Sequence, residues 1–276
     1  MDAADEADPT ILWRSAADRS RKFDAIAQLY DTYRPGYPDE TFDDLISIAG
    51  LGPGDHLVEI GAGTGIATEP LARRGLSITC LEPGLDMAAV AREKLAEWPG
   101  VTFIPTRFED WDVPSRPADA VVAANSWHWV DPEIGFPKSA ATVREGGCLC
   151  VIFHRVVSVG PPGFAEELRH LRAGLAPPTP ADLKAGRYLE SHRWSEDMDA
   201  SGYFEHVQTT AHAFTRTLSA SEFVAVSDTY GPNSRLTAEE RRRLADAVIE
   251  LIDGRFGGAI DKAEEGVLYV GRKTSS

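Results

Sequence analysis

The sequence predicts an α/β fold, and two observations carry that prediction. Short apolar runs alternate with amphipathic helical patterns over residues 56–155, which is typical of a parallel sheet with crossover helices. A glycine-rich turn at residues 61–65 follows the first apolar run and opens a helical pattern. Such turns form the floor of nucleotide sites, because glycine lets the backbone pass close to a ligand. Later patterns, a strand over 206–216, a helix over 236–256 and a strand over 266–272, complete an expected set of seven strands.

The composition restricts the class of protein and its partners. With 276 residues, the chain is long enough for one large domain or for a core with a cap. Its net charge of -15 argues against nucleic acid as a partner, because that affinity rests on Lys and Arg. Cys80, Cys148 and Cys150 lie in apolar runs and form neither a disulfide framework nor a metal site, so we expect a reducing cytoplasm. No signal peptide or membrane partner is expected, since no apolar run is long enough to span a bilayer.

The N-terminal third divides into an arm and two helices. Residues 1–19 are expected to be a mobile acidic arm. Apolar residues over 23–33 and over 39–49 fall at helical spacing, and the segment 34–38 between them holds two prolines and a glycine. Because both helices precede the first strand, we expect residues 20–55 to form a lid over the ligand edge of the sheet. The alternative is that these helices simply pack on the core.

The residues around the glycine turn discriminate between cofactors. A dinucleotide fold has the pattern G-x-G-x-x-G, in which the third glycine packs the helix against the strand. This chain has Gly61, Gly63 and Gly65, with Ile66 at the position of that third glycine. Glu82 ends the next strand, where a carboxylate can accept from both hydroxyls of a ribose. The pattern therefore disfavours an NAD(P)-dependent oxidoreductase and favours another adenosine-containing cofactor.

The segments V-E-I-G-A-G-T-G at 58–65 and L-E-P-G-x-D-M at 81–87 resemble the first two motifs of class I S-adenosylmethionine-dependent methyltransferases. The resemblance implies a Rossmann-like sheet, mostly parallel, with helices on both faces and an antiparallel last strand between the fifth and sixth. It implies S-adenosylmethionine as cofactor, with the glycine turn near its methionine part and Glu82 on its ribose. For Glu59, which precedes the turn, ligand contact and a structural role both stay open.

The resemblance extends to the adenine and to the loop after the fourth strand. It implies that the backbone of Phe108 and the side chain of Glu109 contact the adenine edge, with Asp110 as a competitor for Glu109. Met87 is either an adenine contact or a core residue. The expected cofactor-binding residues are Glu59, Gly61, Ala62, Gly63, Thr64, Gly65, Glu82, Pro83, Met87, Phe108, Glu109, Asn125 and Arg34.

Two further segments narrow the resemblance. Y-R-P-G-Y-P at 33–38 and N-x-x-H-W-V at 125–130 are similar to a small-molecule subgroup that includes the trans-aconitate methyltransferase type. His128 lies between two tryptophans after the fourth strand, at the edge where open α/β sheets place their ligands. Its ordinary pKa lies near neutrality, so it is our candidate general base; the alternative is a histidine that fixes the loop.

The sequence predicts transfer of a methyl group to an O, N or C atom of a small molecule. The expected acceptor pocket comprises Tyr30, Tyr37, Trp127, His128 and Trp129, together with helical cap insertions at about 160–202 and 217–262 of a core spanning 56–276. Arg34 is assigned either to the methionine carboxylate or to an acidic acceptor group. The alternatives are methylation of a protein or nucleic acid, for which the loop lacks an Asn/Asp-Pro-Pro-aromatic motif, and a protein that binds the cofactor without catalysis.

Overall fold

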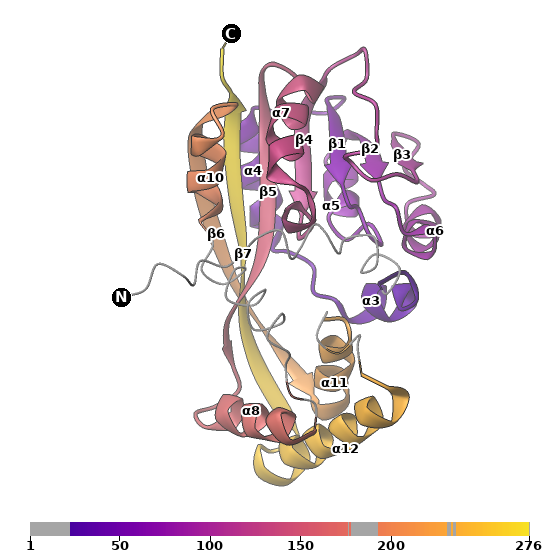
Figure 1. Ribbon diagram of the computed structural model, residues 1–276, viewed down its shortest axis with the longest axis vertical. Coiled ribbons are helices and arrows are strands. Elements are labelled where there is room, and N and C mark those ends of the chain that lie inside the picture. The colour runs from indigo at the N-terminus through magenta and orange to yellow at the C-terminus, as the bar shows by residue number, and fades with distance from the viewer. Residues whose placement is uncertain (1–22, 176, 178–192, 231–232, 234–235, 276) are drawn as a thin grey trace.

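A seven-stranded sheet with the order β3-β2-β1-β4-β5-β7-β6 forms the centre of the computed structural model (Figure 1). The structure describes residues 23–175, 177, 193–230, 233 and 236–275, so the expected arm (1–19) and part of the insertion expected at about 160–202 lie outside the described residues. The strands are β1 (His56–Ile60), β2 (Ser77–Leu81), β3 (Val101–Ile104), β4 (Ala118–Ala124), β5 (Val143–Val159), β6 (Phe204–Ser219) and β7 (Ala259–Lys273).

The direction of the strands confirms the predicted fold class. Strands β1 to β5 pair in parallel, whereas β7 is antiparallel to both of its neighbours, β5 and β6. The central strands are apolar and almost continuously buried, as expected for a parallel sheet covered on both faces. The mostly parallel α/β sheet of seven strands, with its antiparallel last strand between the fifth and sixth, is therefore confirmed.

Helices cover both faces of this sheet. The helices are α3 (Ala27–Tyr33), α4 (Asp39–Ala49), α5 (Thr68–Arg73), α6 (Leu85–Lys94), the 3-10 turn η1 (Trp127–Trp129), α7 (Pro132–Thr142), α8 (Phe164–Leu175), α10 (Trp194–Ala200), α11 (Ala220–Asp228) and α12 (Ala238–Arg255). On one face, Phe42 and Leu71 of α4 and α5 pack into the core. On the other face, Phe136 of α7 and Met198 of α10 do the same. Helix α10 thus belongs to a sheet layer, although it falls within the insertion expected at 160–202.

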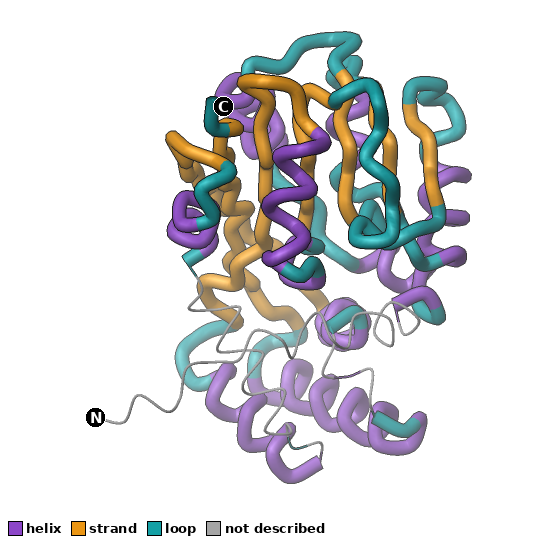
Figure 2. The backbone as a smooth tube through the Cα atoms, turned by 45° about the horizontal axis from the view of Figure 1, so that its top comes forward, coloured by secondary structure: helices purple, strands orange, loops and turns teal. Residues whose placement is uncertain are grey.

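The last three strands extend well past the others and carry a second lobe, which consists of α8, α11 and α12. These helices lie beyond the ends of the other strands in both views (Figure 1, Figure 2). The lobe has its own apolar core, centred on Phe164, Phe223 and Ile252. The sequence predicts shorter strands, over 206–216 and 266–272. Antiparallel pairing continues along them as far as Val159 with Lys262 and Ser219 with Ala259, and this pairing satisfies the backbone polar groups.

The two N-terminal helices differ in what they contact. Helix α4 packs on the face of the sheet formed by β5, β6 and β7, whereas α3 lies against α6 and α11. Lys94 of α6 forms an ion pair with Asp31 of α3 at 2.5 Å. Asp24, just before α3, accepts backbone N–H bonds from Asp86 (2.6 Å) and Met87 (2.9 Å) at the start of α6. Helix α3 therefore bridges the sheet domain and the second lobe. Among the described helices, none is long and apolar enough to cross a membrane.

Candidate cofactor and acceptor site

The turn after β1 has a backbone that only glycine adopts easily. Gly61 and Gly63 have φ values of 64° and 58°, in the left-handed region where a Cβ atom adds strain. A Cβ atom on Gly61 would lie 2.8 Å from Cβ of Ser126, in the loop after β4. A Cβ atom on Gly63 would lie 3.6 Å from Cε of Met87 at the start of α6. The turn is therefore confined between the β4 loop and α6.

Glu82, at the end of β2, holds this turn. Its Oε2 atom accepts from the N–H of Gly63 at 2.8 Å and its Oε1 atom accepts from the N–H of Gly84 at 2.7 Å. Burial raises the pKa of Glu82, while the two N–H bonds oppose that shift by stabilising the carboxylate. Each oxygen of a carboxylate has a further lone pair, so Glu82 can accept two more hydrogen bonds. A vicinal diol presents such a pair of hydroxyls.

Glu59 lies one strand away and has a different environment. It is buried in the core, where its Oε2 atom accepts from the hydroxyl of Thr68 at 2.7 Å. Burial raises the pKa of Glu59 to about 7, although the Thr68 hydrogen bond lowers it. This side chain connects β1 to the helix that follows the turn. Its contacts among the described residues are structural.

The segment after β3 buries one of the two residues expected at the adenine edge. Phe108 is buried and stacks on Trp111, with ring centroids 6.4 Å apart. The carboxylate of Glu109 forms an ion pair with Arg107 at 2.9 Å, and its backbone carbonyl accepts from Lys138 at 2.9 Å. The acidic side chain expected at the adenine edge is thus held by a neighbouring guanidinium. Pro83, which was included in the expected cofactor site, is exposed beside Glu82.

The loop after β4 places the three aromatic residues expected in the acceptor pocket, Trp127, His128 and Trp129, in different environments. Trp127 is 4% exposed and packs on Phe136, with ring centroids 5.1 Å apart, so we assign it to the core and no longer to the acceptor pocket. His128 and Trp129 remain partly exposed, with their rings 4.5 Å apart. The Trp129 ring also meets Phe23 edge-on at 6.4 Å, next to α3. Of these three residues, His128 and Trp129 therefore remain candidates for the acceptor pocket.

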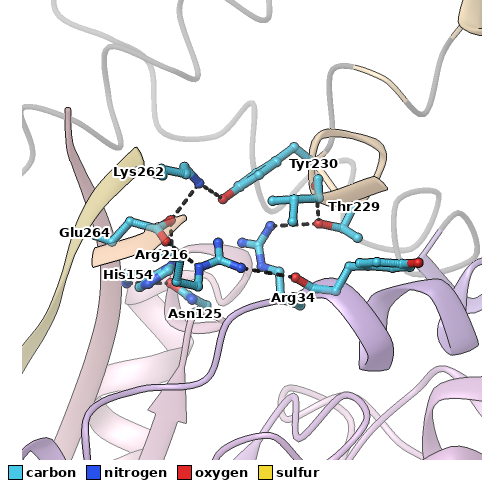
Figure 3. Close-up of polar contacts among 10 residues, drawn as sticks. Arg34, Asn125, His154, Arg216, Thr229, Tyr230, Lys262 and Glu264 are labelled. Atoms are coloured by element: carbon cyan, nitrogen blue, oxygen red, sulfur yellow. Dashed lines mark hydrogen bonds and ion pairs between the residues drawn. The ribbon is translucent and has the colours of Figure 1, made fainter. Parts of the chain in front are cut away.

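A cluster of charged side chains lies on the other side of this loop. We call Arg34, His154, Arg216, Lys262 and Glu264 the charged cluster (Figure 3). The Glu264 carboxylate accepts from Arg216 Nε at 2.8 Å and forms an ion pair with Lys262 Nζ at 2.6 Å. His154 Nδ1 lies 3.8 Å from the same carboxylate. The cluster joins α3 to the three long strands.

Tyrosines and Asn125 surround the charged cluster. The Arg34 guanidinium lies over the Tyr230 ring, 4.2 Å from its centroid, and donates to the hydroxyl of Thr229 at 3.5 Å. Lys262 Nζ donates to the Tyr230 hydroxyl at 2.8 Å. Asn125 has a positive φ of 51°, and its Oδ1 atom accepts from the backbone N–H of His154 at 2.9 Å. The Tyr37 ring meets the His154 ring edge-on at 6.0 Å.

Positive charges outnumber negative charges in this cluster. Burial, followed by the positive charges of Arg34, Lys262 and Arg216, lowers the pKa of His154 to about 4, although Glu264 raises it. His154 is therefore neutral at pH 7. Burial raises the pKa of Glu264, but its bonds to Arg216 and Lys262 outweigh burial and the net shift is downward. The cluster consequently contains three cations and one carboxylate.

The structure brings together only part of the expected site. The glycine turn with Ala62 and Thr64, Glu82 and Met87 border one region. Arg34 belongs to the charged cluster, and Asn125 and Tyr37 border that cluster. Tyr30 lies against the same guanidinium, 5.5 Å from Arg34 Cζ. His154, Arg216, Lys262 and Glu264 escape prediction from sequence. Their one signal is that charged residues occupy alternate positions of a strand, and that pattern is also typical of a solvated surface.

Comparison with known proteins identifies the domain. Residues 58–151 match the family described as "Methyltransferase domain". An uncharacterized methyltransferase from Mycobacterium tuberculosis is 34% identical over 140 residues, which are 51% of this chain and 55% of that protein. The chain thus spans about half the length of the curated relatives that it matches.

Solved structures share the fold at low identity. Phosphoethanolamine N-methyltransferase 2 from Haemonchus contortus, in complex with phosphomonomethylethanolamine and S-adenosylhomocysteine, has a TM-score of 0.55 at 15% identity, covering 95% of this chain and 60% of that one. An S-adenosylmethionine-dependent methyltransferase from Geobacter sulfurreducens, in complex with S-adenosylhomocysteine, has a TM-score of 0.50 at 13% identity, covering 89% and 96%. Residues 58–151 therefore resemble a methyltransferase domain, and the two solved structures, which hold S-adenosylhomocysteine, share the fold of this chain.

The residues present fit the expected cofactor, S-adenosylmethionine. Thr64 is fully buried, and its hydroxyl has no hydrogen-bond partner within the described part of the chain. The glycine turn leaves no room for a Cβ atom at Gly61, and Glu82 keeps lone pairs for the ribose hydroxyls. A carboxylate with spare lone pairs beside backbone that approaches closely suits an adenosine ribose better than a phosphate, which it would repel.

We expect Gly61→Ala to destabilise the protein by about 1–3 kcal/mol, because it forces a Cβ atom into a left-handed conformation and against Ser126. Gly52→Ala is the matched control, since a Cβ atom there meets nothing within 4 Å and its φ is not positive. Urea unfolding monitored by circular dichroism measures both. If the two variants had equal free energies of unfolding, a Cβ atom at position 61 would not strain the turn.

The raised pKa of Glu59 predicts a pH-dependent stability. Because the folded-state pKa (about 7) lies above the ordinary value of 4.5, the contribution of Glu59 is fully present below pH 4.5 and is lost as pH rises to 7. Glu59→Gln should remove this loss. Between pH 4.5 and 8, the free energy of unfolding of the variant should therefore rise by on the order of 3 kcal/mol relative to that of wild type. Denaturant unfolding across this pH range measures the difference. Exposed Glu93→Gln is the control, and a parallel pair of curves for Glu59→Gln and wild type would contradict the prediction.

Proposed function

We propose that the protein is an S-adenosylmethionine-dependent methyltransferase that acts on a small-molecule acceptor. The observation that carries the proposal is Glu82, which is held against the glycine turn by the N–H groups of Gly63 and Gly84. The methyltransferase-domain match over residues 58–151 supports the same reaction. Within this class, the segments at 33–38 and 125–130 favour the small-molecule subgroup that includes the trans-aconitate type.

A small acceptor is supported by the surroundings of the sheet edge. Helix α3 lies between α6 and α11, so the region in front of the glycine turn is covered by a helix and by the second lobe. The Haemonchus structure named above holds a small methyl acceptor, phosphomonomethylethanolamine. The chain's charge of -15 disfavours nucleic acid as the acceptor. The buried free cysteines are compatible with the reducing cytoplasm that we propose as its compartment.

When bound, the cofactor supplies a methyl group that its sulfonium charge has already activated. The protein then has to bind and orient the acceptor and to exclude water, because proximity and shielding account for most of the acceleration of such a displacement. In our proposal Glu82 and the glycine turn orient the cofactor, and Met87 and Phe108 border its adenine. Tyr30, Tyr37, His128 and Trp129 surround the acceptor, and α3 keeps water out.

Cofactor binding tests the role of Glu82. We expect Glu82→Gln to lower the affinity for S-adenosylmethionine by about 10–150-fold. Charged hydrogen bonds contribute about 1.5–3 kcal/mol, and the new amide would face a backbone N–H. Isothermal titration calorimetry measures the affinity, with exposed Glu97→Gln as control and NAD as a control ligand. Unchanged affinity in Glu82→Gln would remove the ribose role. Wild-type protein that binds NAD and not S-adenosylmethionine would overturn the proposed function.

Methyl transfer tests the proposed base. Wild-type protein, radiolabelled S-adenosylmethionine and a panel of small acids, phenols and amines identify an accepted class of substrate. With that substrate, His128→Ala should lower the turnover by about 10²–10⁴-fold while cofactor affinity stays the same, as for loss of a general base. His128→Gln, which keeps a polar side chain, separates proton transfer from loop fixing. Turnover near that of wild type in His128→Ala would exclude His128 as the base.

A further inference from the structure

The charged cluster has an excess of positive charge. Arg34, Arg216 and Lys262 bring three cations, while Glu264 brings one carboxylate and His154 is neutral. Within the described residues, two positive charges therefore lack a counter-charge. Lys262 is 5% exposed and Glu264 is fully buried, while the Arg216 side chain is 22% exposed, so water compensates only part of this excess. A buried charge without a partner is costly, and proteins retain one where a ligand supplies the opposite charge.

Some donors of the cluster also lack acceptors. Arg216 uses Nε for Glu264 and Nη1 for the carbonyl of Tyr33, and Arg34 uses Nη1 for Thr229. Arg216 Nη2 and Arg34 Nε are buried and have no hydrogen-bond partner among the residues that the structure describes. Figure 3 shows the two guanidinium groups and the Lys262 ammonium group gathered near Tyr230 and Glu264. Planar guanidinium donors suit carboxylate and phosphate oxygens.

The charged cluster lies next to the region assigned to the cofactor. Asn125 accepts from the backbone N–H of His154 at 2.9 Å, and the next residue, Ser126, donates to the carbonyl of Ile60. Ser126 also contacts the position where Gly61 would carry a Cβ atom. Two consecutive residues, Asn125 and Ser126, therefore connect the backbone of His154 to the turn after β1. A molecule held by the cluster would extend toward that turn.

We propose that the charged cluster anchors the acceptor through a group or pair of groups carrying two negative charges, as in a phosphomonoester or a dicarboxylate. The inference rests on the proposed function and specifies its substrate class. It does not depend on the segments at 33–38 and 125–130 alone, because Arg216, Lys262 and Glu264 lie outside them. In this arrangement Glu264 orients Arg216 and Lys262, and Tyr230 holds the Lys262 ammonium and the Arg34 guanidinium in place.

The methionine carboxylate of the cofactor is the competing occupant of this cluster. It carries one negative charge and is followed by an ammonium group, so it would leave the excess of two positive charges largely uncompensated. A dianion would neutralise the excess. Binding of cofactor product and binding of anions therefore have to be measured separately.

The test uses the full chain saturated with S-adenosylhomocysteine. Succinate, succinamate and succinamide have similar shapes and carry two, one and no negative charges, and inorganic phosphate represents the phosphomonoester. Calorimetric titration should give the tightest binding for succinate or for phosphate, with a loss of about tenfold or more for each charge removed from succinate. Which of the two binds more tightly distinguishes the sources of the dianion. Equal or absent binding of all four probes would overturn the proposal.

The variant Arg216→Gln tests whether the anionic probes bind at the charged cluster. Arg216→Gln should lower the affinity for the tighter-binding dianion by about tenfold or more. The affinity for S-adenosylhomocysteine should stay within about twofold of the wild-type value. Exposed Arg242→Gln on α12 is the control. If Arg216→Gln instead weakens S-adenosylhomocysteine but not 5′-methylthioadenosine, which lacks the amino acid, the cluster holds the cofactor's carboxylate and the proposal fails. Failure of wild-type protein to bind S-adenosylhomocysteine at all would count against the proposed function itself, and the wild-type probe series does not depend on any variant folding.

Discussion

The packing of Gly61 against Ser126 is the constraint on which the rest of the site depends. These residues follow β1 and β4, which are adjacent parallel strands, so their backbones leave the sheet side by side. Ser126 donates to the carbonyl of Ile60 and lies where a side chain at position 61 would have to go. The preceding residue, Asn125, adopts a left-handed conformation, and its side chain accepts from the backbone N–H of His154. The cofactor region and the charged cluster are coupled through these few bonds.

Two buried carboxylates on neighbouring strands show how environment decides a role. Glu59 accepts from a single hydroxyl and has a pKa near 7, so its proton is held by burial. Glu82 accepts from two backbone N–H groups that belong to the turn itself, and such bonds favour the charged form. The difference arises from the neighbours that the fold provides. It explains why one carboxylate supports β1 while the other faces the region of the ligand.

The long antiparallel strands give the site its second half. Arg216 and Lys262 are opposite each other on β6 and β7, and both contact Glu264. The same strands carry the second lobe, whose residues Thr229 and Tyr230 contact Arg34 from α3. A helix near the N-terminus and strands near the C-terminus therefore meet over one space.

The sequence by itself determined the local features. Glycines at 61, 63 and 65, an acidic residue at 82 and alternating apolar patterns were sufficient to predict the sheet and its strand count, because these depend on backbone conformation and local periodicity. The class of cofactor was implied by the resemblance of these segments to methyltransferase motifs. Only the tertiary structure determined which side chains from distant segments come into contact. It moved Trp127 into the core, and it assembled His154, Arg216, Lys262 and Glu264 around Arg34. Charged residues alternating along a strand look the same whether they face solvent or a buried cation, and the pairing of β5, β6 and β7 alone distinguishes the two.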